Sequence, residues 1–184
     1  MPELEANIVQ VLLTKVQIQT RVQELGAQLA SDYADKMPLF VCLLKGSSIF
    51  FADLVRAVTI PLELDFMRAS SYGDSMVTSG HVQFEVPLSQ TLTGRHVVLV
   101  EDILDTGTTL HAVLPVLEAQ KPASLAVCTL LDKPERRKFE VSLAYRGFSI
   151  PDAFVVGYGL DYAGLYRNLP YIGIYENSEE QQMH

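Results

Sequence analysis

Three runs of mostly apolar residues constrain the fold of this chain more than any other feature. They lie at residues 38–44 (PLFVCLL), 96–102 (HVVLVED) and 124–131 (SLAVCTLL). A strand that is apolar at nearly every position is buried on both faces, which is typical of parallel sheets covered by helices. Helical spacing of apolar residues follows two of these runs, through Phe50–Val55 and Ala112–Leu117. The pattern predicts an α/β fold with a mostly parallel sheet flanked by helices.

The remaining segments supply further elements. Apolar residues at helical spacing predict a helix over residues 4–34, and additional strands are expected at 61–67, 153–158 and 171–175. Residues 68–80 are rich in Ser, Gly and Thr, and His81–Val86 alternates, so we expect a functional flap at the tip of a hairpin. The C-terminal ENSEEQQMH is expected to fray.

Length and charge narrow the classes of function. A chain of 184 residues suits one domain over 1–184, and a net charge of -8 argues against nucleic-acid binding, which needs clustered Lys and Arg. Acidic residues near the N-terminus do not resemble a signal peptide, and no apolar run is long enough for a membrane span. Cys42 and Cys128 sit in apolar runs and are expected to be buried and unpaired. We therefore expect a cytoplasmic protein without a membrane partner.

Polar residues follow the strand predicted at 96–102. The loop DTGTT leads into a helix, and such a loop presents free backbone amides backed by the positive end of the helix dipole. Gly107 allows close backbone approach, and three threonine hydroxyls add donors, namely Thr106, Thr108 and Thr109. This composition suits a phosphate monoester. An ordinary helix N-terminus is an equally good interpretation of the loop alone.

Two adjacent carboxylates, Glu101 and Asp102, precede this loop. Such a pair is self-repulsive without a compensating ligand, and carboxylates accept hydrogen bonds from vicinal hydroxyls, as in dinucleotide sites. A phosphate site beside a diol site describes ribose 5-phosphate. The alternative, a solvated strand end, explains the repulsive pair less well.

The string VVLVEDILDTGTTL resembles the phosphoribosyl-pyrophosphate motif of type I phosphoribosyltransferases. Further stretches are similar to hypoxanthine-guanine phosphoribosyltransferases: LLKGS at 43–47, RASSYGDS at 68–75, LDK at 131–133 and FVVGYGLDYAGLYRNLPYIG at 154–173. The resemblance spans roughly residues 38–176. It implies a type I phosphoribosyltransferase fold, a twisted sheet with a small hood and a flexible flap.

The resemblance implies a role for each matching residue. Ribose 5-phosphate would be bound by Glu101, Asp102, Asp105, Thr106, Gly107, Thr108 and Thr109. Pyrophosphate would be bound by Lys45, Gly46 and Arg167, and the purine by Lys133, Phe154 and Val155. Mg²⁺ would be held by Asp161 with Glu101 and Asp102, and the flap would close through Ser71 and Tyr72. Asp105 is the predicted catalytic base for the purine proton.

The implied reaction joins phosphoribosyl pyrophosphate to hypoxanthine or guanine, giving IMP or GMP in purine salvage. Lys133 carries only hydrogen-bond donors, so it would favour a 6-oxo group over the amino group of adenine. The family commonly has a cis peptide at Leu44–Lys45 and forms homodimers or homotetramers. Ser47 departs from the family form, in which a second glycine follows Gly46, and we interpret it as an added donor or a helix cap.

Alternatives remain at the level of the residues. Without the resemblance, Lys133 is a surface lysine in the charged run DKPERRK, Phe154 is a core residue, and Arg167 is a surface arginine in a loop. A regulator that binds RNA or DNA on the same fold would need a basic face. A sugar-kinase-like or actin-like ATPase would need two large lobes, for which the chain is too short.

Overall fold

A computed structural model describes residues 7–69 and 84–176. Its elements are β1 (Ile8–Leu13), α1 (Lys15–Asp32), β2 (Leu39–Leu43), α2 (Ser48–Ala57), β3 (Glu63–Ala69), β4 (Phe84–Val86), β5 (His96–Leu104), α3 (Thr108–Glu118), β6 (Ser124–Asp132), a 3₁₀ turn (Pro134–Arg136), β7 (Tyr145–Ser149), β8 (Val155–Val156) and β9 (Ile172–Tyr175). The flap residues Ser71 and Tyr72 and the C-terminal tail lie outside the described residues. None of the helices in the described ranges is long and apolar enough to cross a membrane.

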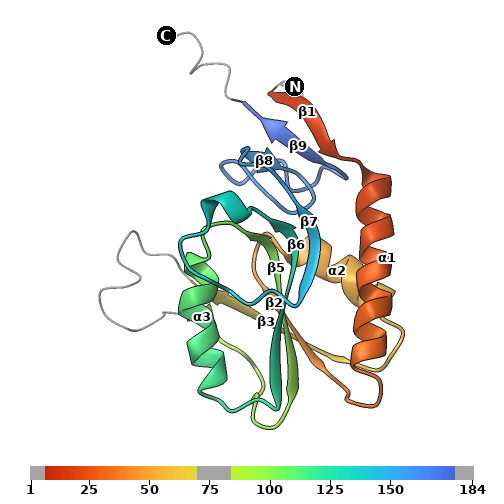
Figure 1. Cartoon of the computed structure of the whole chain (residues 1–184), viewed down its shortest axis with the longest axis vertical. Helices are drawn as coiled ribbons and strands as arrows, with labels where there is room; N and C mark the ends of the chain where they lie inside the picture. The colour runs from red at the N-terminus through yellow and green to blue at the C-terminus, as the bar shows by residue number, and fades with distance from the viewer. Residues whose placement is uncertain (1–6, 70–83, 177–184) are drawn as a thin grey trace.

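Six strands form the main sheet in the order β4-β3-β2-β5-β6-β7, with only the β3–β4 pair antiparallel. This confirms the predicted mostly parallel sheet. A second sheet, β1-β9-β8, is antiparallel and lies above the carboxyl ends of the main strands (Figure 1). It corresponds to the expected hood.

The alternation of side chains along β2 explains why its sequence is apolar throughout. Phe40 and Cys42 pack into the core beneath α1 and α2, whereas Leu39, Val41 and Leu43 pack into a second core with α3. Both faces of the strand are thus covered, and every residue of it is buried. Cys42 and Cys128 are buried and unpaired, as predicted.

The predicted helix over 4–34 is wrong at its N-terminal end. Residues Ile8–Leu13 form β1, which pairs with β9, and α1 begins only at Lys15. Thr14 caps the helix through a capping box with Gln17. The sequence pattern Thr-x-x-Gln marks this start, but the helical spacing of Ile8, Val11 and Leu12 concealed it.

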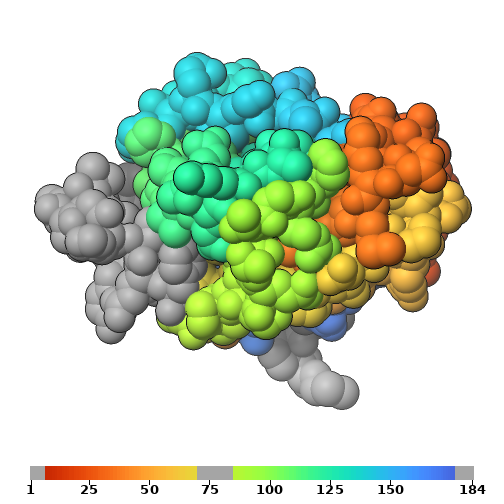
Figure 2. Space-filling view, turned by 90° about the horizontal axis from the view of Figure 1, so that it is seen from below, coloured from red at the N-terminus to blue at the C-terminus, as the bar shows by residue number. Residues whose placement is uncertain are grey.

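Other boundaries also differ from the prediction. Strand β5 continues to Leu104, two residues past the predicted end at 102, so Glu101 and Asp102 lie inside the strand rather than at its end. The strand expected at 153–158 is reduced to Val155–Val156, and β7 at the sheet edge was not predicted. The end of the molecule opposite the small sheet is formed by the turns before β5 and β6 and the neighbouring end of α1 (Figure 2).

Candidate active site

A cavity of about 450 Å³ lies at the carboxyl ends of β2 and β5. Ten consecutive residues, Glu101–Leu110, form much of its wall. The other lining residues come from the strand ends of the main sheet and from the loop between β8 and β9: Leu43, Leu44, Gly46, Ala69, Asp161 and Arg167. Most of the residues predicted for ribose phosphate, pyrophosphate and metal therefore line one cavity. Lys45, Lys133, Phe154 and Val155 lie outside its lining.

The predicted phosphate loop joins β5 to α3. Gly107 occupies the N-cap position of α3 with a φ of 83°, and a Cβ there would lie 2.6 Å from the carbonyl oxygen of Phe139. The Thr106 and Thr108 hydroxyls lie 2.9 Å apart, and the Thr108 amide donates to Thr106 Oγ1. The first turn of a helix has amides without intrahelical acceptors. The loop therefore offers backbone donors and hydroxyls to an anion at the end of the helix dipole.

The acidic pair faces this loop from β5. The Asp102 amide donates to Glu101 Oε1, and the Ile103 amide donates to Asp102 Oδ1 at 2.7 Å. Burial, together with the neighbouring Asp102 charge, raises the pKa of Glu101 well above its usual range, and burial also raises the pKa of Asp102. Two carboxyl groups are thus held where their charge is unfavourable. A cation or hydroxyl donors of a ligand would relieve that cost.

The loop between β8 and β9 adds an ion pair to the cavity. Arg167 Nη2 lies 2.6 Å from Asp161 Oδ1, and Nη1 donates to the Gly159 carbonyl. The Gly164 amide donates to Asp161 Oδ2. Both oxygens of Asp161 and two nitrogens of Arg167 are engaged within this loop, so an anionic ligand would have to compete for the guanidinium.

The candidate metal ligands do not form a closed site. In the described ranges, no three His, Cys, Asp or Glu residues cluster closely enough to hold a metal ion by themselves. Glu101, Asp102 and Asp161 nevertheless line the same cavity. This arrangement fits Mg²⁺, which is commonly held by one or two carboxylates together with substrate phosphates.

The segment after β2 contains the cis peptide Leu44–Lys45, a point that the sequence left open. Lys45 is exposed, whereas Ser47 is fully buried. Ser47 occupies the N-cap position of α2, but its side chain makes no capping hydrogen bond: its hydroxyl donates to the Leu43 carbonyl and lies 3.2 Å from Cys42 Sγ. The helix thus begins where the cap was predicted, and the Ser47 hydroxyl is a donor to the interior of the protein rather than to the first amides of the helix.

Gly46 leaves room for the acidic pair. A Cβ at this position would lie 1.5 Å from Asp102 Oδ2, so only glycine is compatible with the observed carboxylate position. We expect Gly46→Ala to displace Asp102 and weaken phosphoribosyl pyrophosphate binding at least tenfold, as measured by calorimetry. Gln28→Ala, at an exposed position of α1, is the control. Equal affinity in Gly46→Ala and the wild type would contradict this account.

Lys133 follows β6, and its amide donates to the Leu104 carbonyl at 2.9 Å. The residue is only 4% exposed, so its interpretation as a surface lysine is wrong. Within the described part of the chain, its Nζ has no ion-pair or hydrogen-bond partner. A lysine with a buried stem and an unpaired ammonium suits recognition of an acceptor on a ligand.

Phe154 is 52% exposed, so its interpretation as a core residue is also wrong. Its ring packs edge-on against Tyr162 in the loop between β8 and β9 and against Tyr175 of β9. Val155 is buried in β8 and pairs with Ile174. The exposed ring on a fixed aromatic support is available for stacking with a ligand.

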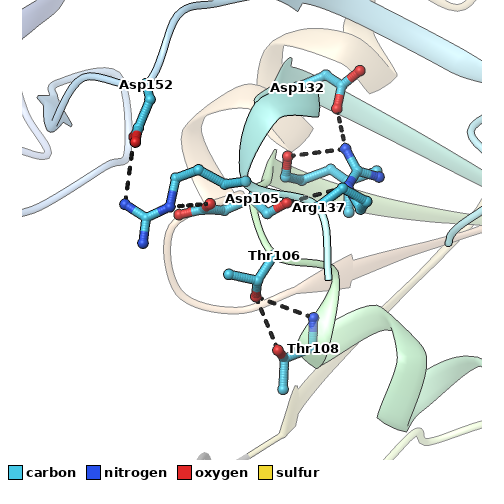
Figure 3. A network of polar contacts seen from close by, with 8 residues as sticks. Asp105, Thr106, Thr108, Asp132, Arg137 and Asp152 are labelled. Atoms are coloured by element: carbon cyan, nitrogen blue, oxygen red, sulfur yellow. Dashed lines mark hydrogen bonds and ion pairs between the residues drawn. The ribbon is translucent and has the colours of Figure 1, made fainter. Parts of the chain in front are cut away.

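Two arginines that follow Lys133 in the charged run DKPERRK were not predicted as site residues. Arg137 Nε donates to the Asp105 carbonyl at 3.2 Å, and its guanidinium pairs with buried Asp132. Arg136 Nε lies 3.1 Å from Asp105 Oδ1 (Figure 3).

At the base of the expected flap, Arg68 pairs with Glu85 and braces the strand pair β3–β4.

The α/β sheet, the loop of anion donors, the acidic pair and the hood are together typical of enzymes that act on nucleotides or sugar phosphates. Residues 12–163 match the phosphoribosyl transferase domain family. The chain belongs to this family.

Relatives within the family are more specific. The hypoxanthine-guanine phosphoribosyltransferase of Bacillus subtilis is 47% identical over 171 residues, which cover 93% of this chain and 95% of the relative. The hypoxanthine phosphoribosyltransferase of Haemophilus influenzae is 49% identical over 173 residues, covering 92% and 97%. A crystal structure of a hypoxanthine phosphoribosyltransferase from Staphylococcus aureus superposes with a TM-score of 0.90 at 46% identity, covering 96% of each chain.

Proposed function

We propose that this protein transfers the 5-phosphoribosyl group from phosphoribosyl pyrophosphate to hypoxanthine, and also to guanine, in purine salvage. The observation that carries the proposal is one cavity lined by the acidic pair, the DTGTT loop, Asp161 and Arg167. Relatives at 47% and 49% identity are named for the same reaction. The alternative of a nucleic-acid regulator gains no support from them.

Different residues of the cavity and its surroundings would bind different parts of phosphoribosyl pyrophosphate. The amides and hydroxyls of the DTGTT loop would bind the 5′-phosphate, and Glu101 and Asp102 would bind the ribose hydroxyls. Lys45, Gly46 and Arg167 would bind pyrophosphate. Mg²⁺, held by Asp161 and the acidic pair together with substrate oxygens, would neutralise the charge of the leaving group. Ser71 and Tyr72 would close the flap and exclude water from the ribosyl centre.

The purine would lie between Lys133 and Phe154. Lys133 would donate to the 6-oxo oxygen, Phe154 would stack on the ring, and the Val155 backbone would meet the purine edge. Purine N9 then bonds to the anomeric carbon while the bond from that carbon to pyrophosphate oxygen breaks, and the electron pair leaves with pyrophosphate. Asp105 takes the N7 proton. We also propose that the protein forms a homodimer or a homotetramer and acts in the cytoplasm.

A substrate panel tests the proposal. With Mg²⁺ and phosphoribosyl pyrophosphate present, we expect pyrophosphate release with hypoxanthine and guanine and none above background with adenine, because Lys133 offers no acceptor to an amino group. Pyrophosphate release is measured for each base separately, with xanthine as a fourth substrate. Turnover with adenine alone would overturn the assigned purine class. The absence of pyrophosphate release with all four bases would overturn the proposed phosphoribosyltransferase activity.

A further inference from the structure

Arg136 lies between two carboxylates that belong to different parts of the fold. Its Nε is 3.1 Å from Asp105 Oδ1, and its Nη1 is 3.4 Å from Asp152 Oδ1 (Figure 3). Asp105 follows β5 of the main sheet, whereas Asp152 lies two residues before Phe154. The guanidinium of Arg136 therefore connects Asp105, the predicted base, to the segment that carries Phe154, the ring proposed to stack on the purine.

The two oxygens of Asp105 are in different environments. Oδ1 is buried and has no hydrogen-bond donor within the described ranges, although the side chain as a whole is 35% exposed. The exposed part of the side chain therefore does not include Oδ1. Arg136 approaches Oδ1 closely but outside hydrogen-bonding geometry, so the contact is a charge attraction that restrains the carboxylate.

The neighbours of Arg136 already fix the backbone of this loop. Arg137 Nε donates to the Asp105 carbonyl, the Lys133 amide donates to Leu104, and the amides of Lys138 and Phe139 donate to Thr106. Arg136 is the member of this segment that contacts the Asp105 side chain. Because its own side chain is 47% exposed, the ion pair contributes little to folding.

We propose that Arg136 is a positioning residue for Asp105: it restrains Oδ1 of the carboxylate so that Oδ2 is the oxygen that takes the purine proton. Asp152 fixes Arg136 from the opposite side. The proposal rests on the proposed function, in which Asp105 is the base. It concerns the orientation of Asp105 and not contact between Arg136 and substrate.

Single variants provide the first test. We expect Arg136→Ala to lower kcat about tenfold or more, because a loosely held base is misplaced, while KM for phosphoribosyl pyrophosphate stays unchanged. Arg136→Lys retains one positive charge and should recover part of the loss. Arg56→Ala is the control, since that arginine is 75% exposed and pairs with Asp53 on α2. A kcat of Arg136→Ala equal to that of the control would overturn the proposal.

A double-mutant cycle distinguishes an effect of Arg136 that acts through Asp105 from an effect that is independent of Asp105. If Arg136 acts through Asp105, then adding Arg136→Ala to Asp105→Asn lowers kcat no further. Additive losses would overturn the positioning role. If Asp105→Asn alone is fully active, the base assignment of the proposed function fails as well. If Asp105→Asn is impaired and Arg136→Ala is not, only the role of Arg136 is overturned.

Discussion

Asp105→Asn is expected to lower kcat by about 10²- to 10⁴-fold, the range over which a positioned general base contributes to a reaction. Asparagine has the shape of aspartate but cannot accept the purine proton as a carboxylate does. Asp105 is well placed for this role, because it lines the same cavity as the acidic pair and the threonines of the phosphate loop. Its backbone is held by Arg137, so the substitution leaves the loop in place.

The measurement for this variant is steady-state kinetics with hypoxanthine, combined with calorimetry of phosphoribosyl pyrophosphate binding. Binding should change little, since the loop amides and hydroxyls that would hold the phosphate remain. Asp35→Asn is the matched control, because Asp35 is exposed beyond the end of α1. Unchanged turnover in Asp105→Asn would remove the base role, and a proportional loss of ligand affinity would make Asp105 a binding residue instead.

Lys133→Met is expected to lower kcat/KM for hypoxanthine by about 10²-fold, because the 6-oxo oxygen loses a charged hydrogen-bond donor. Methionine preserves most of the apolar stem of this 4% exposed residue, so the packing at the end of β6 is retained. The affinity for phosphoribosyl pyrophosphate should not change, because Lys133 lies outside the lining of the cavity that contains the phosphate loop.

Discrimination between bases is the sharper measurement for Lys133. The ratio of kcat/KM for hypoxanthine to that for adenine should fall in Lys133→Met, since the group proposed to select a 6-oxo acceptor is gone. Lys121→Met, in the exposed turn between α3 and β6, is the control. An unaltered ratio would show that another residue selects the oxopurine, and equal loss of both ligands would contradict a role confined to the base.

Much of the phosphate-binding region could be predicted from local sequence. The junction of β5 and α3 combines an apolar strand, an acidic pair and a glycine at positive φ, and each of these is encoded within a few residues. The cavity brings together residues from the ends of β2 and β5, because parallel strands end on the same side of a sheet. The roles of Ser71 and Tyr72 stay predictions.

The purine-binding roles proposed for Lys133 and Phe154 could be inferred only through resemblance. By pattern, Lys133 is a surface residue and Phe154 a core residue, and the structure reverses both, with Lys133 buried and Phe154 half-exposed. Periodicity reports which face of its own element a residue occupies. It does not report whether a neighbouring element covers that face.

The sequence by itself determined the parallel core, because a strand that is apolar on both faces can be satisfied only between two layers of helices. It also determined the loop that we propose binds the phosphate, since the donors of that loop belong to one short segment. Tertiary structure alone decided that residues 8–13 form a strand, since the backbone partners of β1 come from β9 at the other end of the chain. It alone also placed Arg136 between Asp105 and Asp152, because an ion pair depends on three segments meeting in space.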